Sequence, residues 1–492
     1  MKTIPEGLIN FKSFERIIFE IMCQIACELI QEYLEWRDKS IMALRDTKEY
    51  RYIDKRNTTV KTVMGEVPFS RVYYRKKSGG YVFLLDDLLG LDCGCGLVSE
   101  NLAEQIVANC SDKSFRKAAS DISEFTGQGI SRMGAWNVFQ RYGEVIRMQE
   151  TRLQELVECG VTGCLSNVAS KVLFKEFDDI WISLQKEKRR KRGTTATEAA
   201  EKVEKKPGKK PMHAGTAYTG WSQAKDGSYS TVDKLAYAAF SDVDGFISKF
   251  ESLLNQYFDM DGVERQVSNG DGESWFRTEA EATDSILQLD PYHRSEAIIK
   301  AVGDKYDRKL LFDAIDGKDV EKVLDRICDL MLKAEGEKPF EKLVKLYNYY
   351  SNNKDIFLTW QERGIELPAP PKGIAYRNLG TQESSNCNLI TQRMKHRKGS
   401  WSKKGANNMA KILCFKNTIG LDTIMGVLPE PPSALPWVDP LSAAKAPAHD
   451  GKGYGADWLY AQMPFEKTFR THGREAIRGM LRMKPLSQLA FH

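Results

Sequence analysis

The sequence predicts an α/β core that is interrupted by an all-helical domain and preceded by an α+β region. Two observations support this prediction. A strand with acidic residues over 172–184 is followed by two more extended segments, a helix and a second strand that ends at Asp271. Helical periodicity alone then fills residues 294–371. Acids on the first and fourth strands of such a series are the arrangement of a ribonuclease-H-like fold.

Length and composition predict a globular protein of two to four domains. The chain has 492 residues, of which 42% are hydrophobic and 28% charged, so it can bury sizeable cores. No apolar run reaches the ~18 residues that a membrane helix needs, and no signal-peptide pattern is present. A cytoplasmic location without a membrane partner is therefore expected. Only Cys93 and Cys95 of the ten cysteines are closely spaced, which favours reduced thiols over a zinc site.

The net charge of +5 is concentrated in two stretches. Residues 186–210 hold eleven Lys and Arg against four Glu, and residues 391–411 hold seven against none. Such patches suit a polyanion, although a single run of charge is more often a solvated loop. Because residues 186–210 also lack apolar periodicity, they are expected to form a loop that is disordered or that orders on binding.

Residues 1–98 predict a long helix followed by a small β module. Apolar residues recur every three or four positions over 11–48, as in an amphipathic helix that provides a packing surface. Alternation over 57–86 predicts a β-hairpin with Gly65 in its turn, and a further strand at 81–85.

Residues 99–160 return to helical periodicity and contain a candidate helix-turn-helix. Ser114 can open a first helix, residues 127–129 supply a glycine-rich turn, and Ser131 can cap a second helix. In a DNA-binding motif of this type the second helix enters the major groove. The alternative is an ordinary helical hairpin in a core. The second helix is expected to expose Arg132, Gln140 and Arg141.

The predicted strand over 172–184 carries Glu176, Asp178 and Asp179 at its middle. A buried strand has little reason to hold acids there unless they bind something, while an edge strand with solvated acids is the alternative. Alternation decides only that Asp178 or Asp179 faces a site. Extended segments at 216–221 and 235–240 and a helix over 244–258 follow.

The second acid, Asp271, lies between Gly270 and Gly272, which allow a tight turn before a helix that starts near Trp275. A solvated Asp-Gly turn is the alternative. A fifth strand over 285–290 is followed by Pro291, a typical first residue of a helix.

After the helical domain, a last helix is expected from about Gly380. It has Glu383 near its start and ends in the basic residues Arg393, Lys395 and Arg397. Residues 372–430 are expected to complete the core that residues 170–293 begin. The tail over 431–492 is left unassigned.

In this order, these motifs resemble bacterial DDE insertion-sequence transposases of the ISLre type, a family related to the Mutator-like transposases. The resemblance covers roughly residues 10–430. The motifs are GEVPFSRVYYR at 65–75, LDDLLGL at 85–91, EFD at 176–178, NGDGESW at 269–275, LDPYH at 289–293, ESSN at 383–386, RMK at 393–395, SWS at 400–402 and GA at 405–406.

The resemblance implies a metal site, DNA partners and an assembled state. Asp178, Asp271 and Glu383 would hold two Mg²⁺ or Mn²⁺ ions about 3.5–4 Å apart, and Asp178 is preferred to Asp179 because it keeps the Glu-x-Asp register. The partners would be the element's terminal inverted repeats and target DNA, bound by a homo-oligomer at the prokaryotic nucleoid. The residues expected to bind DNA are Arg132, Arg141, Lys188, Arg189, Arg190, Lys191, Arg192, Arg393, Lys395 and Arg397.

One further residue and two further functions belong to the hypothesis. His293 could contact the scissile phosphate or the leaving group, although a histidine near a helix start is more often structural. An active transposase is favoured, because the presence of all three acids weighs against a degenerate protein and because a repair nuclease would not need the helix-turn-helix candidate or the family-like motifs outside the active site. A degenerate transposase that only binds DNA and a metal-dependent repair nuclease of the same fold are the alternatives.

Overall fold

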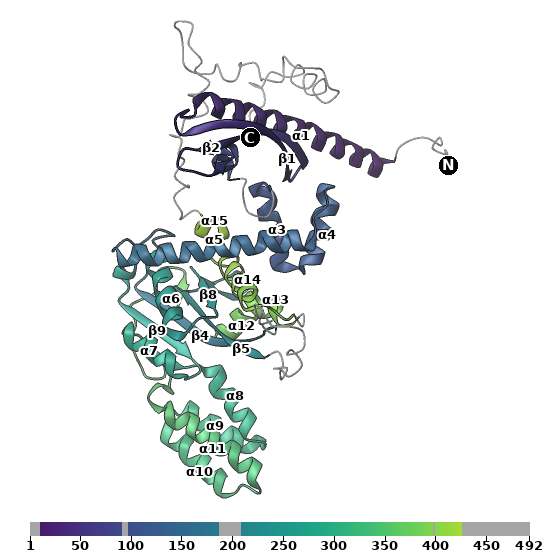
Figure 1. The fold of residues 1–492 in the computed structure, drawn as a ribbon. Helices are drawn as coiled ribbons and strands as arrows, with labels where there is room; N and C mark the ends of the chain where they lie inside the picture. The colour runs from purple at the N-terminus through teal and green to yellow at the C-terminus, as the bar shows by residue number, and fades with distance from the viewer. Residues whose placement is uncertain (1–9, 91–96, 186–207, 397–398, 426–492) are drawn as a thin grey trace, which may run out of the picture. The chain divides into compact units, whose positions relative to one another are not determined.

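The computed structural model describes residues 10–90, 97–185, 208–396 and 399–425 (Figure 1). The described residues form two compact units, one up to Arg141 and the other from Tyr142 onward. Among the described residues, no helix has an apolar stretch long enough to cross a membrane.

The first unit begins with the long helix α1 (Phe11–Leu44) and an antiparallel sheet of β1 (Tyr50–Thr62), β2 (Gly65–Lys76) and β3 (Tyr81–Val82). The second half of α1 packs on this sheet and contributes Leu34 and Ile41 to the core. In the first half the apolar side chains of Phe11, Phe14 and Ile18 remain exposed. The expected packing surface is therefore covered over only half of the helix by the described residues.

Two local predictions in this module are wrong. Gly65 is the first residue of β2 and pairs with Thr62, so the turn consists of the two residues between them. The strand expected at 81–85 ends at Val82 and gives way to α2 (Leu84–Leu89). The helix is favoured because Leu84 and Leu85 are both buried in the core, and consecutive residues of a strand would point to opposite faces.

Three helices follow: α3 (Glu100–Asp112), α4 (Phe115–Thr126) and α5 (Arg132–Glu158). The Ser114 side chain caps α4 by accepting a hydrogen bond from Lys117 N, and Gly127 ends the helix with a φ of 68°. Ser131 Oγ accepts from Gly134 N at 2.9 Å at the start of α5. The predicted caps and turn are therefore present.

The exposure expected on α5 is partly wrong. Arg132 and Arg141 are exposed, but Gln140 is only 7% exposed. It follows Val138 and Phe139, which are also buried, so the inward face of the helix is wider than the sequence suggested.

The second unit is built on a five-stranded sheet in the order β10-β9-β4-β5-β8. The strands are β4 (Val172–Ser183), β5 (Lys209–Tyr218), β8 (Leu235–Ala239), β9 (Arg265–Gly270) and β10 (Ile286–Leu289). β4 lies at the centre, parallel to β9 and antiparallel to β5. The strand that carries Asp178 and the strand that ends before Asp271 are therefore neighbours.

Alternation along β4 sends its side chains to two different environments. Phe177 packs in an aromatic cluster with Phe250 of α6 (Val243–Tyr257) and with Trp275 and Phe276 of α7 (Ser274–Ala282). The side chains of Glu176 and Asp178 lie on the other face. Glu176 accepts a hydrogen bond from the backbone N–H of Gln382, the first residue of α12 (Gln382–Asn386), and Asp178 accepts one from the side chain of Asn386, the last. The acids therefore meet the last helical segment and not the aromatic cluster.

The helical insertion consists of α8 (Pro291–Ala301), α9 (Lys305–Asp316), α10 (Val320–Leu332), α11 (Glu337–Asn352) and the short helix η3 (Lys354–Ile356). It is drawn in green in Figure 1. The helices end before the predicted limit of 371. The later residues of this stretch lead to β11 (Ile374–Ala375), which pairs with β6 (Gly220–Gln223); β7 (Tyr229–Val232) completes that small sheet.

The predicted last helix is present in three parts. α12 passes into a π-helical turn, η4 (Cys387–Thr391), and then into α13 (Gln392–Met394). A π turn inside a helix is often found at functional sites. α14 (Lys403–Lys416), which packs against β8, and α15 (Leu421–Met425) complete the described chain.

Candidate functional site

Asp178 occupies the middle of β4 and is the centre of the candidate site. Its Oδ2 accepts a hydrogen bond from Asn386 Nδ2 at 2.6 Å, and its Oδ1 accepts from Asp179 N at 2.7 Å. Burial, together with the negative charges of Asp271 and Glu383, raises its pKa to about 6, although the positive charge of His293 acts in the opposite direction. Asp178 therefore lies within electrostatic range of both other predicted acids and of the histidine.

Asp271 follows β9 in a turn that only glycines can flank. A Cβ on Gly270 would lie 2.6 Å from the Phe276 ring, and Gly272 has a φ of 92° with Asn353 only 2.7 Å from the place of its Cβ. Burial raises the pKa of Asp271, although the hydrogen bond from Glu273 N and the charge of His293 oppose this. The tight glycine turn predicted from the sequence thus presents a partly buried carboxylate.

Tyr349 connects the helical insertion to this turn. Its hydroxyl, on α11, donates a hydrogen bond to the backbone carbonyl of Asp271 at 2.8 Å. Arg277 of α7 makes a parallel connection by ion pairing with Asp355 at 2.6 Å. The insertion therefore helps to fix the position of the second acid.

Glu383 lies in the first turn of α12, and its side chain is exposed. The helix start is held by the fully buried carboxylate of Glu176 on β4. That carboxylate accepts hydrogen bonds from Gly380 N at 2.8 Å, Thr381 N at 2.9 Å and Thr381 Oγ1 at 2.5 Å. A negative charge at a helix start also interacts favourably with the helix dipole.

The sequence did not assign Glu176 a role of its own. It was identified only as part of the Glu-x-Asp motif, although a spacing of two places it on the same face of the strand as Asp178. Tyr218 OH and Asn269 Nδ2 also donate to Glu176, at 2.5 and 3.2 Å. A buried carboxylate with this many donors is fully compensated for the loss of water.

Asp290 and His293 form a second connected pair at the start of α8. Asp290 caps the helix, and its Oδ2 lies 2.7 Å from His293 Nδ1. Burial would lower the pKa of His293, but the bond to Asp290 and the charges of Asp290, Asp178 and Asp271 raise it to about 9. His293 is therefore an imidazolium at neutral pH, directed into the field of the acids.

The structure distinguishes Asp178 from its neighbour. Asp179 lies on the opposite face of β4, where its Oδ1 is 2.7 Å from His213 Nδ1 on β5. The His213 ring packs edge-on against Trp275 at 5.2 Å between centroids. Although the charge of Asp179 reaches Asp271, Asp178 is the acid that faces Glu383.

The donor atoms of the three acids fit a hard divalent cation in type and charge. Carboxylate oxygens are the ligands that Mg²⁺ and Mn²⁺ prefer, and a cation would relieve the repulsion that adds to burial in raising the pKa of Asp178. Among the described residues, however, no three Asp, Glu, His or Cys side chains are drawn together closely enough to enclose one ion. The acids share a site but are not closed around a metal.

The residues predicted to bind DNA differ in their exposure to solvent. Arg132, Arg141 and Lys395 are exposed. Arg393 is only 9% exposed, and its guanidinium lies 5.2 Å from the centroid of the Trp401 ring, so it does not present its charge to solvent. The remaining predicted residues, Lys188, Arg189, Arg190, Lys191, Arg192 and Arg397, lie outside the described residues.

Comparison with known proteins gives one family. A model described as "Uncharacterised protein family (UPF0236)" matches residues 4–424. Two UPF0236 proteins of Caldanaerobacter subterraneus subsp. tengcongensis are each 23% identical over 411 residues, covering 82% of this chain and 77% or 78% of the relative. The printed name of the first joins eleven numbered designations. The resemblance to ISLre-type or Mutator-like transposase families is therefore corrected: the family found across the chain is UPF0236.

Proposed function

The chain belongs to UPF0236, an uncharacterised protein family, and from its site we propose that it is a divalent-metal-dependent enzyme that cuts and joins DNA strands, acting as a transposase. One observation carries the proposal. Asp178, Asp271 and Glu383 come from β4, the turn after β9 and α12, which are far apart in the chain, and the charges of Asp271 and Glu383 both raise the pKa of Asp178. Structural acids are rarely placed where they repel one another, whereas the acids of functional sites often are.

We also propose a ribonuclease-H-like core for the second unit. Numbered along the chain, the strands of the sheet follow the order 5-4-1-2-3, with only the second strand antiparallel to both of its neighbours. This supports the proposal because the first and fourth strands lie side by side, as the sequence hypothesis required. The helical insertion lies between the fifth strand and the helix with the third acid.

The chain's own residues supply distinct parts of the proposed chemistry. Asp178, Asp271 and Glu383 would hold the cations, which when bound activate water or a 3′-hydroxyl and stabilise the leaving oxygen of a phosphodiester. The imidazolium of His293 can donate a hydrogen bond to an oxygen of the scissile phosphate, and Asp290 keeps it protonated and oriented. Glu176 keeps the helix of Glu383 in place.

A nuclease of the same fold would use the same site, so site geometry does not separate the two functions. The name of the relative favours transposition. Understood as gene designations, its eleven numbers mean that one organism carries the same protein at eleven places. Repeated copies of one coding sequence are what a mobile element produces, and a housekeeping nuclease has no need of them.

The proposal is tested with purified protein, Mg²⁺ and a plasmid that carries the chain's gene with its flanking DNA. The wild type is expected to cut at the flanks, leave 3′-hydroxyl ends and join them to a second plasmid. Asp178→Asn, Asp271→Asn and Glu383→Gln should each abolish cutting while DNA binding persists. Glu281→Gln, an exposed acid on α7, is the matched control and should cut normally. Full cutting by Asp271→Asn would end the catalytic assignment, and cutting without joining would favour the nuclease.

A further inference from the structure

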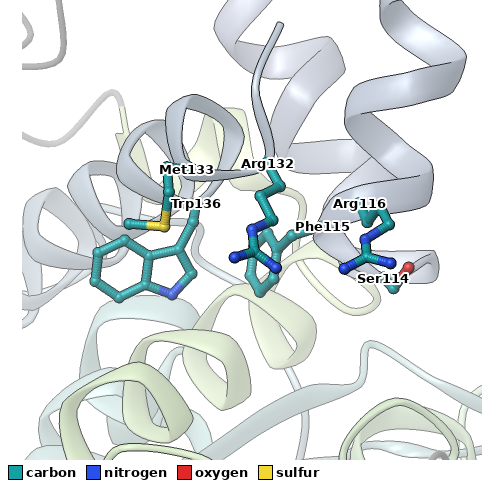
Figure 2. Close-up of a pocket in the computed structure, with 6 residues that line it drawn as sticks. All are labelled: Ser114, Phe115, Arg116, Arg132, Met133 and Trp136. Carbon is teal, nitrogen blue, oxygen red and sulfur yellow. The ribbon is translucent and has the colours of Figure 1, made fainter.

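A pocket of about 510 Å³ lies in the first unit, between the first turns of α4 and α5. Its volume falls in the range of small-molecule sites, about 300–1,000 Å³. Figure 2 shows the guanidinium of Arg132 between the indole of Trp136 and the guanidinium of Arg116. The described residues that line it are Ser114, Phe115, Arg116, Arg132, Met133 and Trp136.

The apolar part of the pocket is aromatic and held in place. The ring of Phe115 packs edge-on against Phe139, with 5.4 Å between centroids, which anchors it to α5. Trp136 is half-buried, and Met133 is 54% exposed. Together they leave large apolar side chains accessible, and such exposure at a concave surface usually marks a binding site.

The charged part of the pocket is positive and uncompensated. Arg116 and Arg132 are both exposed, and within the described parts of the chain neither has an ion pair or hydrogen bond from its guanidinium to another side chain. None of the six described lining residues is an acid. An anionic ligand therefore meets two free guanidinium groups beside an aromatic surface.

We propose that this pocket binds an unstacked nucleotide of DNA, with its base on Trp136 and its phosphates on Arg116 and Arg132. The inference rests on the proposed function only in taking DNA as the ligand. A simple anion would need no aromatic surface, and an apolar peptide would need no pair of arginines. Aromatic side chains that stack bases beside cationic groups that bind phosphates are the combination found in single-strand binding sites.

A paired base within a duplex cannot present its face to Trp136, because its neighbours in the stack cover both faces. The nucleotide must therefore be unpaired, as at a bulge, a frayed end or an extruded position. This use of Arg132 differs from reading base edges in the major groove. If the pocket holds an unpaired nucleotide, the first turns of α4 and α5 must lie where the DNA duplex is distorted.

Binding is measured by fluorescence anisotropy in EDTA, so that no strand is cut, on a short duplex and on the same duplex with one bulged thymine. The wild type is expected to bind the bulged DNA roughly tenfold more tightly. Trp136→Ala should remove this preference while leaving the affinity for the paired duplex unchanged. Trp181→Ala, which removes an exposed tryptophan outside the pocket, should keep it.

Two further measurements protect the test against a misfolded variant. Met133→Glu changes only an exposed side chain of the lining, and the added carboxylate should remove the preference by repelling phosphate. A 2-aminopurine at the bulge should lose fluorescence on binding the wild type but not Trp136→Ala. An equal affinity of the wild type for both duplexes, or an equal effect of Trp136→Ala and Trp181→Ala, would overturn the inference. Because DNA cutting is measured in a separate experiment, neither result of the binding assay decides whether the metal-site proposal is correct.

Discussion

The carboxylate of Glu176 accepts hydrogen bonds from both the backbone N–H and the hydroxyl of Thr381, at 2.9 and 2.5 Å. The two residues are 205 positions apart in the chain. Thr381 immediately precedes α12, so these hydrogen bonds connect the start of the helix that carries Glu383 to the strand that carries Asp178. At the other end of α12, Asn386 makes a second connection by donating a hydrogen bond to Asp178 at 2.6 Å.

Glu176→Gln is predicted to loosen α12 and to reduce DNA cutting at least tenfold, an estimate of about 1.5–3 kcal/mol from the loss of charge-assisted hydrogen bonds. Amide hydrogen exchange over 380–386 should become faster, because Gln cannot supply the negative charge that holds these N–H groups. Glu279→Gln is the matched control. It also removes a fully buried carboxylate, but one that pairs with Lys175 on the opposite face of β4. If exchange over 380–386 rises equally in both variants, Glu176 has only a general stabilising role.

The sequence predicted β4, β8 and β10 closely because their signals are local, but it placed the second extended segment at 216–221 and a loop up to residue 210, whereas β5 runs over Lys209–Tyr218. Alternation and β-branched residues indicate β4, and the glycines on either side of Asp271 indicate a tight turn. The structure shows why a glycine is required there, because a Cβ on Gly270 would lie only 2.6 Å from the Phe276 ring. The partners of Glu176 could not be predicted in this way. Its donors come from β5, β9 and the segment before α12, and no local pattern records a contact between segments so distant in the chain.

The failed predictions have a common physical cause, which is that burial depends on tertiary packing. Gln140 and Arg393 were expected on the surface because they are polar, yet both are buried. Leu84 and Leu85 were expected in a strand because of their composition, but the core accepts both and imposes a helix. Polar residues therefore predict helix caps reliably, because the bonding partner is only three residues away in the chain. They predict exposure to solvent less reliably, because exposure depends on distant parts of the fold.

His293 is predicted to titrate near pH 9 in EDTA, its pKa being raised from 6.5 to about 9. The raised pKa means that the protonated ring stabilises the folded state fully below about pH 6.5 and that this contribution is lost as the pH rises through 9, with an upper limit of roughly 3 kcal/mol. NMR of histidine-labelled protein can follow the six histidines, and His293→Gln identifies the signal. The unfolding free energy of the wild type relative to this variant should fall between about pH 6.5 and 9.

Mg²⁺ provides the complementary measurement for His293. A cation held by Asp178 and Asp271 would offset the negative charges that raise the pKa of the imidazole, so the midpoint should move to lower pH when Mg²⁺ replaces EDTA. A midpoint below pH 7 in EDTA, or one that Mg²⁺ leaves in place, would contradict the assigned surroundings of this ring.

The basic stretch within 186–210 is predicted to bind DNA phosphates. Replacing 188–206 by a Gly/Ser segment of equal length should weaken binding to all sequences alike. It should also lower the slope of log affinity against log salt by about 0.9 for every phosphate that the protein no longer neutralises. Changing only the four glutamates of 186–210 to glutamines is the control, and it should leave the slope the same or steeper. An unchanged slope after the replacement would show that this stretch does not touch the DNA backbone.

The last prediction concerns the buried ion pair between Lys411 of α14 and Glu150 of α5, whose side chains are 2% and 1% exposed. Lys411 Nζ also lies 3.2 Å from Tyr237 OH on β8, so the ammonium contacts side chains of both α5 and β8. Burial lowers the pKa of Lys411, while the charge of Glu150 opposes this.

Lys411→Met alone leaves the Glu150 carboxylate buried without its cation and should cost about 3–5 kcal/mol of unfolding free energy. The double variant Lys411→Met with Glu150→Leu removes both charges at once and should recover most of that loss, because an apolar pair of similar volume needs no compensation for lost water. Urea denaturation of the wild type, both single variants and the double variant gives the coupling energy. If the two single losses simply add in the double variant, the charges do not compensate each other, and the pair does not hold α5 on α14.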